Sequence, residues 1–458
     1  MAGSSQADAP IKGIDQLVEY FEAGCTPREQ WKVGVEYEQP VVYTASGQAV
    51  AYEGPSGIGE LLAFFAREFG WTPIEEDGQV IALHDDRASI TLEPGGQFEL
   101  SGATLSSLHQ AENELSRHLE QVSRAGRELG LSFLGLGISP KTPLPQMPWM
   151  PKRRYRVMRE FMLRTGTLGH RMMQQTATVQ SNFDYSSEAD ALAKFRVAMA
   201  MAPLLVAVSA NSPVVDGRPS GYRSYRAHVW SDTDSDRCGY LPFVFNSNSF
   251  FASYTDYALD VPMYFVLRDE NCVDSEGLTF RQFMQKGVAG EQATMGDWTY
   301  HLSTLFPEVR LKNWIEARSA DNQPPRLMLA TPALLKGLLY DDDCLLAAWD
   351  LLKDWPLDRL AELHEDAARV ALSARVKKHT LGRYGLELLE IAREGLKRQA
   401  GANPEAIDGQ GRDETRHLDS LEELLTARRC PADEIIELWE GPWSGDVDRL
   451  VSRANCAQ

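Results

Sequence analysis

Residues 32–39 read KVGVEYEQ, and this short stretch decides the fold of the 458-residue chain. Apolar and acidic residues alternate along it, and successive side chains of a β-strand point to opposite faces. The residues expected to face the core are Val33, Val35 and Tyr37, and those on the other face are Gly34, Glu36 and Glu38. The pattern predicts a buried strand that carries two carboxylates on one side.

A second stretch, residues 89–100 (SITLEPGGQFEL), repeats this pattern with Glu93 and Glu99. Carboxylates on the polar faces of two strands repel one another and are costly to desolvate, and a bound cation neutralises them. We therefore hypothesise a metal or acid–base site, with a solvent-facing strand edge as the alternative. The intervening Pro94-Gly95-Gly96 is typical of a tight turn, with close backbone approach to a phosphate as the alternative.

Two further stretches carry polar residues at strand spacing. Residues 176–185 (TATVQSNFDY) place Gln180 and Asn182 on one face of a third predicted strand. In residues 315–318 (IEAR), an extended backbone would place Glu316 and Arg318 on one face. This last pair is either an internal ion pair or a metal ligand beside a cation aimed at a transferring phosphoryl group.

Basic residues cluster in two places in this acidic chain. Residues 152–159 (KRRYRVMR) are typical of a solvated helix face, and phosphate binding is the alternative because arginine matches phosphate geometry. Arg226 and Trp230 alternate with apolar residues on either side of His228. An arginine near a tryptophan suits an amino-acid carboxylate, and a packed edge strand explains the same pattern.

Composition and charge exclude several classes of protein. The formal net charge is −19, which argues against a nucleic-acid binder but leaves room for ATP in a local basic pocket. Six scattered cysteines without a CxxC pair, and a polar start without an apolar signal core, favour a reduced cytoplasmic protein. The longest apolar run, residues 197–210, contains Pro203 and is too short to span a bilayer, so we expect a buried core helix and no membrane association.

The remaining pattern indicates one α+β unit covering residues 1–458, since no boundary between independent domains is evident. Periodicity predicts helices at residues 14–23, 57–69, 105–129 and 188–210, and strands at 132–138 and 259–267. Beyond about Pro332 the chain is expected to be mostly helical.

Several of these stretches together resemble the plant and proteobacterial type of glutamate–cysteine ligase (γ-glutamylcysteine synthetase). They run in family order over nearly the whole chain: residues 92–103 (LEPGGQFELSGA), 151–159, 178–184, 187–196, 226–237, 241–245, 257–266 (YALDVPMYFV), 306–312 (FPEVRLK) and 340–343. The first and seventh of these are long strings of low degeneracy, which makes chance a poor explanation.

The resemblance implies a fold and a reaction. The fold is expected to be similar to glutamine synthetase, with a curved, mostly antiparallel sheet that forms a funnel and helices packed outside. ATP would phosphorylate the γ-carboxylate of glutamate, and the amine of cysteine would attack the acyl phosphate, in the first step of glutathione-type thiol biosynthesis. Mg²⁺ would bridge the phosphates and neutralise developing charge. The partners expected are small molecules alone, with the enzyme a monomer or homodimer.

The resemblance also assigns roles to residues of this chain. The expected metal ligands are Glu36, Glu38, Glu93, Glu99 and Glu316, with Gln180 and Asn182 as polar partners of metal or nucleotide. The expected glutamate-binding residues are Arg226 and Trp230, the expected stabilisers of phosphate or intermediate are Arg318 and Arg154, and Tyr264 belongs to the expected acceptor pocket.

The chain departs from the family pattern at its first motif. The family has a sequence close to GTEHEKF, whereas residues 34–40 here read GVEYEQP, so that Tyr37, Gln39 and Pro40 replace His, Lys and Phe. Arg223 stands where the plant enzymes have an apolar residue. Two alternatives therefore accompany the main interpretation: a paralogue that uses an amine other than cysteine, and a catalytically silent regulatory homologue.

Overall fold

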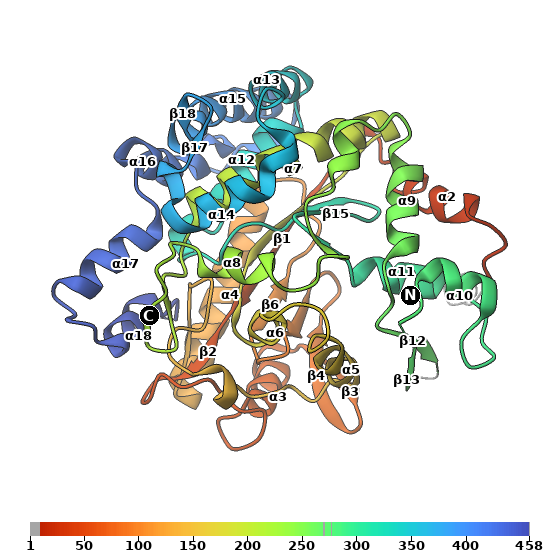
Figure 1. The fold of residues 1–458 in the computed structure, drawn as a ribbon. Coiled ribbons are helices and arrows are strands. Elements are labelled where there is room, and N and C mark those ends of the chain that lie inside the picture. The colour runs from red at the N-terminus through yellow and green to blue at the C-terminus, as the bar shows by residue number, and fades with distance from the viewer. Residues whose placement is uncertain (1–9, 269–270, 276, 458) are drawn as a thin grey trace.

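A computed structural model describes residues 10–268, 271–275 and 277–457, so the polar start of the chain lies mostly outside the described residues. An eight-stranded sheet occupies the centre of the molecule, in the order β15-β16-β8-β1-β6-β5-β4-β3, and every pairing in it is antiparallel (Figure 1). Its strands are β1 (Val33–Gln39), β3 (Thr72–Glu76), β4 (Gln79–His84), β5 (Ser89–Leu92), β6 (Phe98–Ser101), β8 (Val179–Phe183), β15 (Val309–Leu311) and β16 (Ile315–Ala317).

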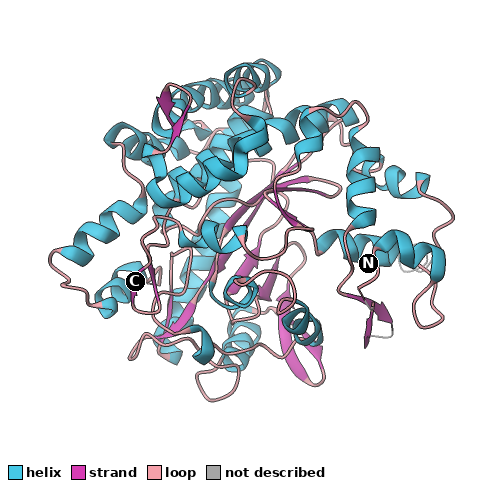
Figure 2. Cartoon of the chain, in the orientation of Figure 1, coloured by secondary structure: helices cyan, strands magenta, loops and turns pink. Residues whose placement is uncertain are grey.

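Helices surround the strands (Figure 2). They are α2 (Asp15–Glu22), α3 (Ile58–Phe69), α4 (Leu108–Leu129), α5 (Arg153–Phe161), α6 (Gly169–Gln175), α7 (Glu188–Ser209), α8 (Tyr225–Ser231), α9 (Phe250–Asp260), α10 (Phe280–Lys286), α11 (Met295–Ser303), α12 (Ala330–Leu339), α13 (Asp342–Leu352), α14 (Leu360–Val370), α15 (Leu381–Ala402), α16 (Asp419–Ala427), α17 (Pro431–Glu440) and α18 (Val447–Ala454). The chain from α12 onward is mostly helical, as its sequence predicts. Short two-stranded pieces complete the fold: β2 (Val41–Tyr43) with β7 (Leu131–Phe133), β9 (Val214–Val215) with β10 (Arg218–Pro219), β11 (Cys238–Gly239) with β14 (Phe306–Pro307), β12 (Phe265–Arg268) with β13 (Asn271–Asp274), and β17 (Arg375–Val376) with β18 (His379–Thr380).

The strand that opens the sequence analysis lies inside the sheet, between β6 and β8. Its apolar face packs in the main hydrophobic core together with α3 and α4, and Tyr37 is only 1% exposed. Gln39 lies on this same side, where it accepts a hydrogen bond from Nε2 of the buried His118 (3.2 Å). Two of the three replaced residues of the first motif, Tyr37 and Gln39, therefore face the core, away from the glutamates.

Helix α7 is the buried core helix that the sequence predicts. Among the described residues it alone is long and apolar enough to cross a membrane by length and composition, and 83% of its apolar window is buried inside the protein. It contains Pro203 and contributes residues to both large hydrophobic clusters. Burial on several sides explains why its sequence is apolar all round.

Two predicted strands are only partly correct. The strand expected at residues 259–267 is β12 alone, because Leu259 belongs to α9, whose aromatic residues are buried at helical spacing, and Pro262 intervenes before the strand. The strand expected at residues 132–138 is confined to β7. A Cβ at Gly137 would lie 2.5 Å from the Asp321 carboxyl carbon, so here the backbone passes closely over a buried side chain instead of forming a ladder.

Candidate active site

The polar face of the sheet forms one wall of a cavity of about 310 Å³. The opposite walls come from α5, α6, α8 and α11. Nine of the residues predicted from the sequence line it: Glu36, Glu38, Glu93, Glu99, Arg154, Gln180, Arg226, Trp230 and Arg318. The structure thus brings predicted residues that are almost 300 positions apart in the sequence together around one cavity.

Strand register brings the carboxylates together. Glu38 lies directly opposite Glu99 across the β1–β6 ladder, and Glu36 lies opposite Gln180 across the β1–β8 ladder. On the far side of β8, Asn182 lies opposite Glu316 of β16. Like charges directly opposite each other destabilise a sheet, so this arrangement requires a compensating interaction.

The carboxylates of β1 and β6 are held by neutral donors. Glu38 accepts hydrogen bonds from the Thr178 backbone N–H (3.0 Å) and from Gln180 Nε2 (3.2 Å). Glu99 accepts from the hydroxyls of Thr91 (2.6 Å) and Ser101 (2.8 Å). Burial, reinforced by the neighbouring carboxylates, raises the pKa of Glu38 well above its ordinary value and raises that of Glu99 as well.

Glu36 lies in a similar environment, where Asn182 Nδ2 donates a hydrogen bond to it (2.7 Å). Burial, with the charges of Glu316 and Glu99, raises the pKa of Glu36 to about 7. Gly34 makes this contact possible, because a Cβ there would meet the Asn182 side chain at 3.3 Å. The glycine on the glutamate face thus leaves room for an amide.

Glu316 is the exception among the glutamates. It is fully buried and forms ion pairs with Arg310 (2.7 Å), Lys312 (3.4 Å) and Arg318. Burial alone would raise its pKa, but these three cations hold the pKa below its ordinary value. Arg318 also donates to Gln180 Oε1 (2.5 Å), so this guanidinium joins the ion cluster to the β8 amide.

Arg226 and Trp230 lie on α8, one helical turn apart. The edge strand considered from the sequence is therefore wrong: Ser224 caps a short helix, and its Oγ accepts from the Ala227 N–H (3.1 Å). The Arg226 guanidinium donates to the backbone oxygens of Arg318 (2.9 Å) and Ser319 (3.3 Å). Both Arg226 and Arg318 lie 5.9 Å from the centre of the Trp230 ring.

The basic cluster at residues 152–159 begins at the loop before α5 and divides between two cavities. Arg154 faces the glutamate cavity, whereas Arg153, Arg156 and Arg159 line a neighbouring cavity of about 490 Å³. Lys152 is buried and donates to the Leu92 carbonyl (2.9 Å). Burial, together with the charge of Arg154, lowers the pKa of Lys152 to about 7.

Three predicted residues do not line the cavity. Asn182 and Glu316 share the polar face of the sheet but do not line the cavity, and each contacts a residue that does. Tyr264 is 3% exposed and packs in a separate cluster, where Arg237 lies 3.9 Å from its ring centre and Phe161 lies at 4.7 Å.

Three residues that line the cavity carry a buried polar atom without a hydrogen-bond partner. These atoms are Arg154 Nε, Arg226 Nε and Trp230 Nε1. Buried polar atoms are normally paired, so such a group of them indicates that a ligand completes their bonding.

Comparison with known proteins places this chain in a family. Residues 32–453 match the model described as glutamate–cysteine ligase family 2. The chain is 41% identical over 447 residues to the chloroplastic glutamate–cysteine ligase of Medicago truncatula, covering 97% of this chain and 85% of that one. It is also 41% identical over 437 residues to the Arabidopsis thaliana chloroplastic enzyme, covering 95% and 81%. The chain belongs to the glutamate–cysteine ligase family.

A solved structure supports the fold. The glutamate–cysteine ligase of Francisella tularensis, crystallised in complex with AMP, aligns with a TM-score of 0.53 at 15% identity, covering 92% of this chain and 88% of that one. At this identity the likeness concerns the fold alone, and it confirms the expected glutamine synthetase-like α+β architecture. Family membership confirms the resemblance seen in the sequence and the assignment of this chain as a ligase.

The sequence interpretation of this ligase missed three residues of the site. Arg310 and Lys312 line the cavity and share one face of the β15 segment, a spacing of two that is visible in residues 309–312 (VRLK). Asp321 is buried, acts electrostatically on Arg226 and accepts hydrogen bonds from the hydroxyls of Ser212 (2.6 Å) and Ser224 (2.7 Å). No local pattern indicates Asp321, because its partners lie about 100 positions away.

The Pro-Gly-Gly segment is a turn, as preferred from its sequence. The Gly96 N–H donates to the Glu93 carbonyl (2.9 Å), and Gly96 has φ +87°. A Cβ on Gly95 would lie 2.1 Å from the Gln174 carbonyl oxygen. Gly95 therefore allows close packing of the turn against α6, and Gly96 supplies the left-handed backbone conformation of the turn.

Proposed function

We propose that this enzyme joins the γ-carboxyl of L-glutamate to the amine of L-cysteine with consumption of ATP. The observation that carries the proposal is the set of carboxylates with raised pKa values facing arginines across one cavity, in a chain that belongs to the glutamate–cysteine ligase family. Anionic substrates need the arginines, and the carboxylates need a cation.

The carboxylates suit Mg²⁺. Glu36, Glu38, Glu93 and Glu99 line the cavity with oxygen ligands only, and Asn182, which does not line it, donates a hydrogen bond to Glu36. Mg²⁺ prefers such oxygen donors and keeps several waters and substrate phosphates as further ligands. Bound there, it would neutralise the charge of a transferring phosphoryl group. Glu316 already has three cationic partners, and its predicted role as a metal ligand stays a prediction.

The arginines of the cavity suit the phosphate and carboxylate groups of the substrates. Arg318 is fixed between Glu316 and Gln180, so its guanidinium is held in place for a developing phosphoryl charge. Arg154 lines the cavity from α5 and suits the remaining phosphates. Arg226, with Trp230 beside it, suits the α-carboxylate of glutamate.

The reaction follows in two steps. A γ-carboxylate oxygen of glutamate attacks the terminal phosphorus of ATP, giving an acyl phosphate and ADP. The amine nitrogen then attacks the acyl carbon, inorganic phosphate leaves, and the nitrogen loses a proton to give the amide. Positioning and charge stabilisation account for most of the catalysis in such transfers.

The acceptor is assigned from the family. Tyr264, expected in the acceptor pocket, does not line the cavity. Tyr37 and Gln39 face the core, so the changed first motif gives no reason to replace cysteine. We keep cysteine as the acceptor on the strength of the family. Cytoplasmic location, a monomeric or homodimeric state and the absence of nucleic-acid partners stay predictions.

A phosphate-release assay tests the proposal. The purified enzyme is given MgATP and glutamate with cysteine, with 2-aminobutyrate as a thiol-free amine of similar shape, or with other amines. We expect turnover that requires glutamate and is highest with cysteine. Good turnover with another amine and negligible turnover with cysteine would favour the paralogue, and no glutamate-dependent ATP consumption with any amine would favour the silent homologue.

A further inference from the structure

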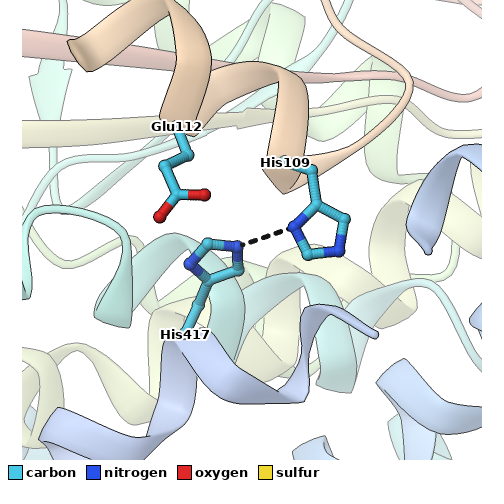
Figure 3. Close-up of side chains that lie close together, drawn as sticks. All are labelled: His109, Glu112 and His417. Atoms are coloured by element: carbon cyan, nitrogen blue, oxygen red, sulfur yellow. Dashed lines mark hydrogen bonds between the residues drawn. The ribbon is translucent and has the colours of Figure 1, made fainter. Parts of the chain in front are cut away.

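A second group of metal-binding side chains lies outside the glutamate cavity (Figure 3). His109 and Glu112 lie three residues apart at the start of α4, and His417 lies in the 3₁₀ helix η8 (Glu414–Leu418). The spacing places His109 and Glu112 on one face of α4, toward His417. One potential ligand atom from each residue lies within 4.8 Å of the other two.

The two imidazoles are already at the separation of metal ligands. His109 Nδ1 lies 3.4 Å from His417 Nε2. Two nitrogens that bind a tetrahedral Zn²⁺ at about 2.0–2.1 Å lie about 3.3–3.4 Å apart. The carboxylate oxygen lies within 4.8 Å of both nitrogens, so it must approach them by at most about 1.5 Å to reach the same separation, and a rotation of the partly exposed Glu112 side chain (37% exposed) can supply this.

A backbone carbonyl fixes the orientation of His109. Its Nε2 lies 3.2 Å from the Ala406 carbonyl oxygen, which can only accept a hydrogen bond. Nε2 therefore carries the proton, and Nδ1 presents its lone pair to Nε2 of His417, which donates to it in the metal-free protein. When both nitrogens bind one ion, the His417 proton moves to its Nδ1. Metal-binding histidines are oriented by such a hydrogen bond from the second ring nitrogen.

Arg416 has a carboxylate partner whether or not Glu112 binds a metal ion. In the structure its guanidinium forms an ion pair with Glu112. Its Nε is buried without a hydrogen-bond partner and lies 3.7 Å from the Asp408 carboxylate. If Glu112 turns toward a metal, Arg416 has a second carboxylate within reach, so Glu112 can leave it without stranding a buried charge.

We propose that His109, Glu112 and His417 bind one divalent transition-metal ion of the Zn²⁺ type, with water as the fourth ligand. Two imidazoles and one carboxylate are a recurrent zinc ligand set, whereas Mg²⁺ prefers oxygen ligands. This site is separate from the carboxylates of the glutamate cavity. Its ligands are 308 residues apart, so the ion would link α4, behind the sheet, to the C-terminal helical region and stabilise the folded chain.

Metal binding to protein stripped with EDTA and dialysed into excess Mg²⁺ tests the proposal. Calorimetric titration with Zn²⁺ and thermal unfolding with and without Zn²⁺ are compared for wild type, His417→Gln, Glu112→Gln and a control, His84→Gln, on an exposed residue of β4. We expect one equivalent of Zn²⁺ and a higher Tm for wild type and control. His417→Gln should weaken binding more than about 100-fold, since even the loss of an outer partner costs about 10–100-fold. Glu112→Gln should weaken binding at least about tenfold.

Substitution with Co²⁺ identifies the ligands. Four-coordinate Co²⁺ should give a strong visible absorption in wild type and control, and this absorption should disappear in His417→Gln. Glu112→Gln keeps the test decisive if His417→Gln fails to fold, because Glu112 is partly exposed. Equal Zn²⁺ affinity in the wild type and both ligand variants, or no rise in the Tm of the wild type with one equivalent of Zn²⁺, would overturn the proposal.

Discussion

Replacing Glu36 with glutamine should change how the stability of the metal-free enzyme depends on pH. The pKa of Glu36 is raised from 4.5 to about 7 in the folded protein, first by burial and then by Glu316 and Glu99. Between these values the folded protein keeps a proton that the unfolded chain has lost, so stability falls as pH rises through this window. At about 1.4 kcal/mol for each pH unit, the difference corresponds to about 3 kcal/mol lost by pH 8.

The assay is urea unfolding at pH 5 and pH 8 in EDTA, for wild type and Glu36→Gln. The wild type should lose stability between the two pH values, and the variant should lose about 3 kcal/mol less, because glutamine cannot ionise. Glu120→Gln, on an exposed residue of α4, is the matched control and should behave as wild type. Adding Mg²⁺ should flatten the wild-type dependence. Equal pH dependence in wild type and Glu36→Gln, or stability that rises from pH 5 to pH 8 through this group, would refute the reasoning.

Three further substitutions separate catalysis from folding. Glu38→Gln should reduce turnover at least about 100-fold with an unchanged circular dichroism spectrum, since a neutral amide cannot balance a cation; retained turnover would contradict the metal role. Arg318→Lys keeps the charge but loses the fork that spans two partners, so kcat should fall about 100-fold in the phosphate-release assay, and an unchanged kcat would rule out its role. Gly95→Ala forces a Cβ against the Gln174 carbonyl and should cost about 1–3 kcal/mol or more in urea unfolding, whereas Gly13→Ala, with open space around it, should cost little; equal effects would contradict the packing argument.

The strand face of the site could be predicted from sequence because it depends on short-range alternation. A period of two determines which side chains share a face, and it placed Glu36 and Glu38 opposite Tyr37 correctly. A local sequence pattern does not say which residues of two strands pair. Only the strand register of the structure therefore shows that Glu38 lies opposite Glu99. The family resemblance supplied the fold, which alternation alone left open.

The parts that escaped prediction depend on contacts between distant segments. Arg226 and Trp230 lie on a helix of seven residues, too short for periodicity to distinguish it from a strand. The positioning of that helix depends on Asp321, whose carboxylate binds two serines remote in sequence. The same limitation applies to His417, which meets His109 from the other end of the chain.

Two glutamates on one sheet face, Glu316 and Glu38, have pKa values shifted in opposite directions. The difference indicates which part of the site binds a cation. Glu316 has three cationic side chains beside it, and its pKa is held down although it is fully buried. Glu38 has neutral donors as its hydrogen-bond partners and other carboxylates close by, and its pKa is raised. The protein thus pairs Glu316 of β16 directly with cations, whereas Arg226 and Arg318 act on Glu38 only at longer range. A cation that arrives with a substrate would bind beside Glu38 and Glu99, whose hydrogen-bond partners are neutral. The ion pair with Glu316 would hold Arg318 on the other side of the transferring phosphoryl group.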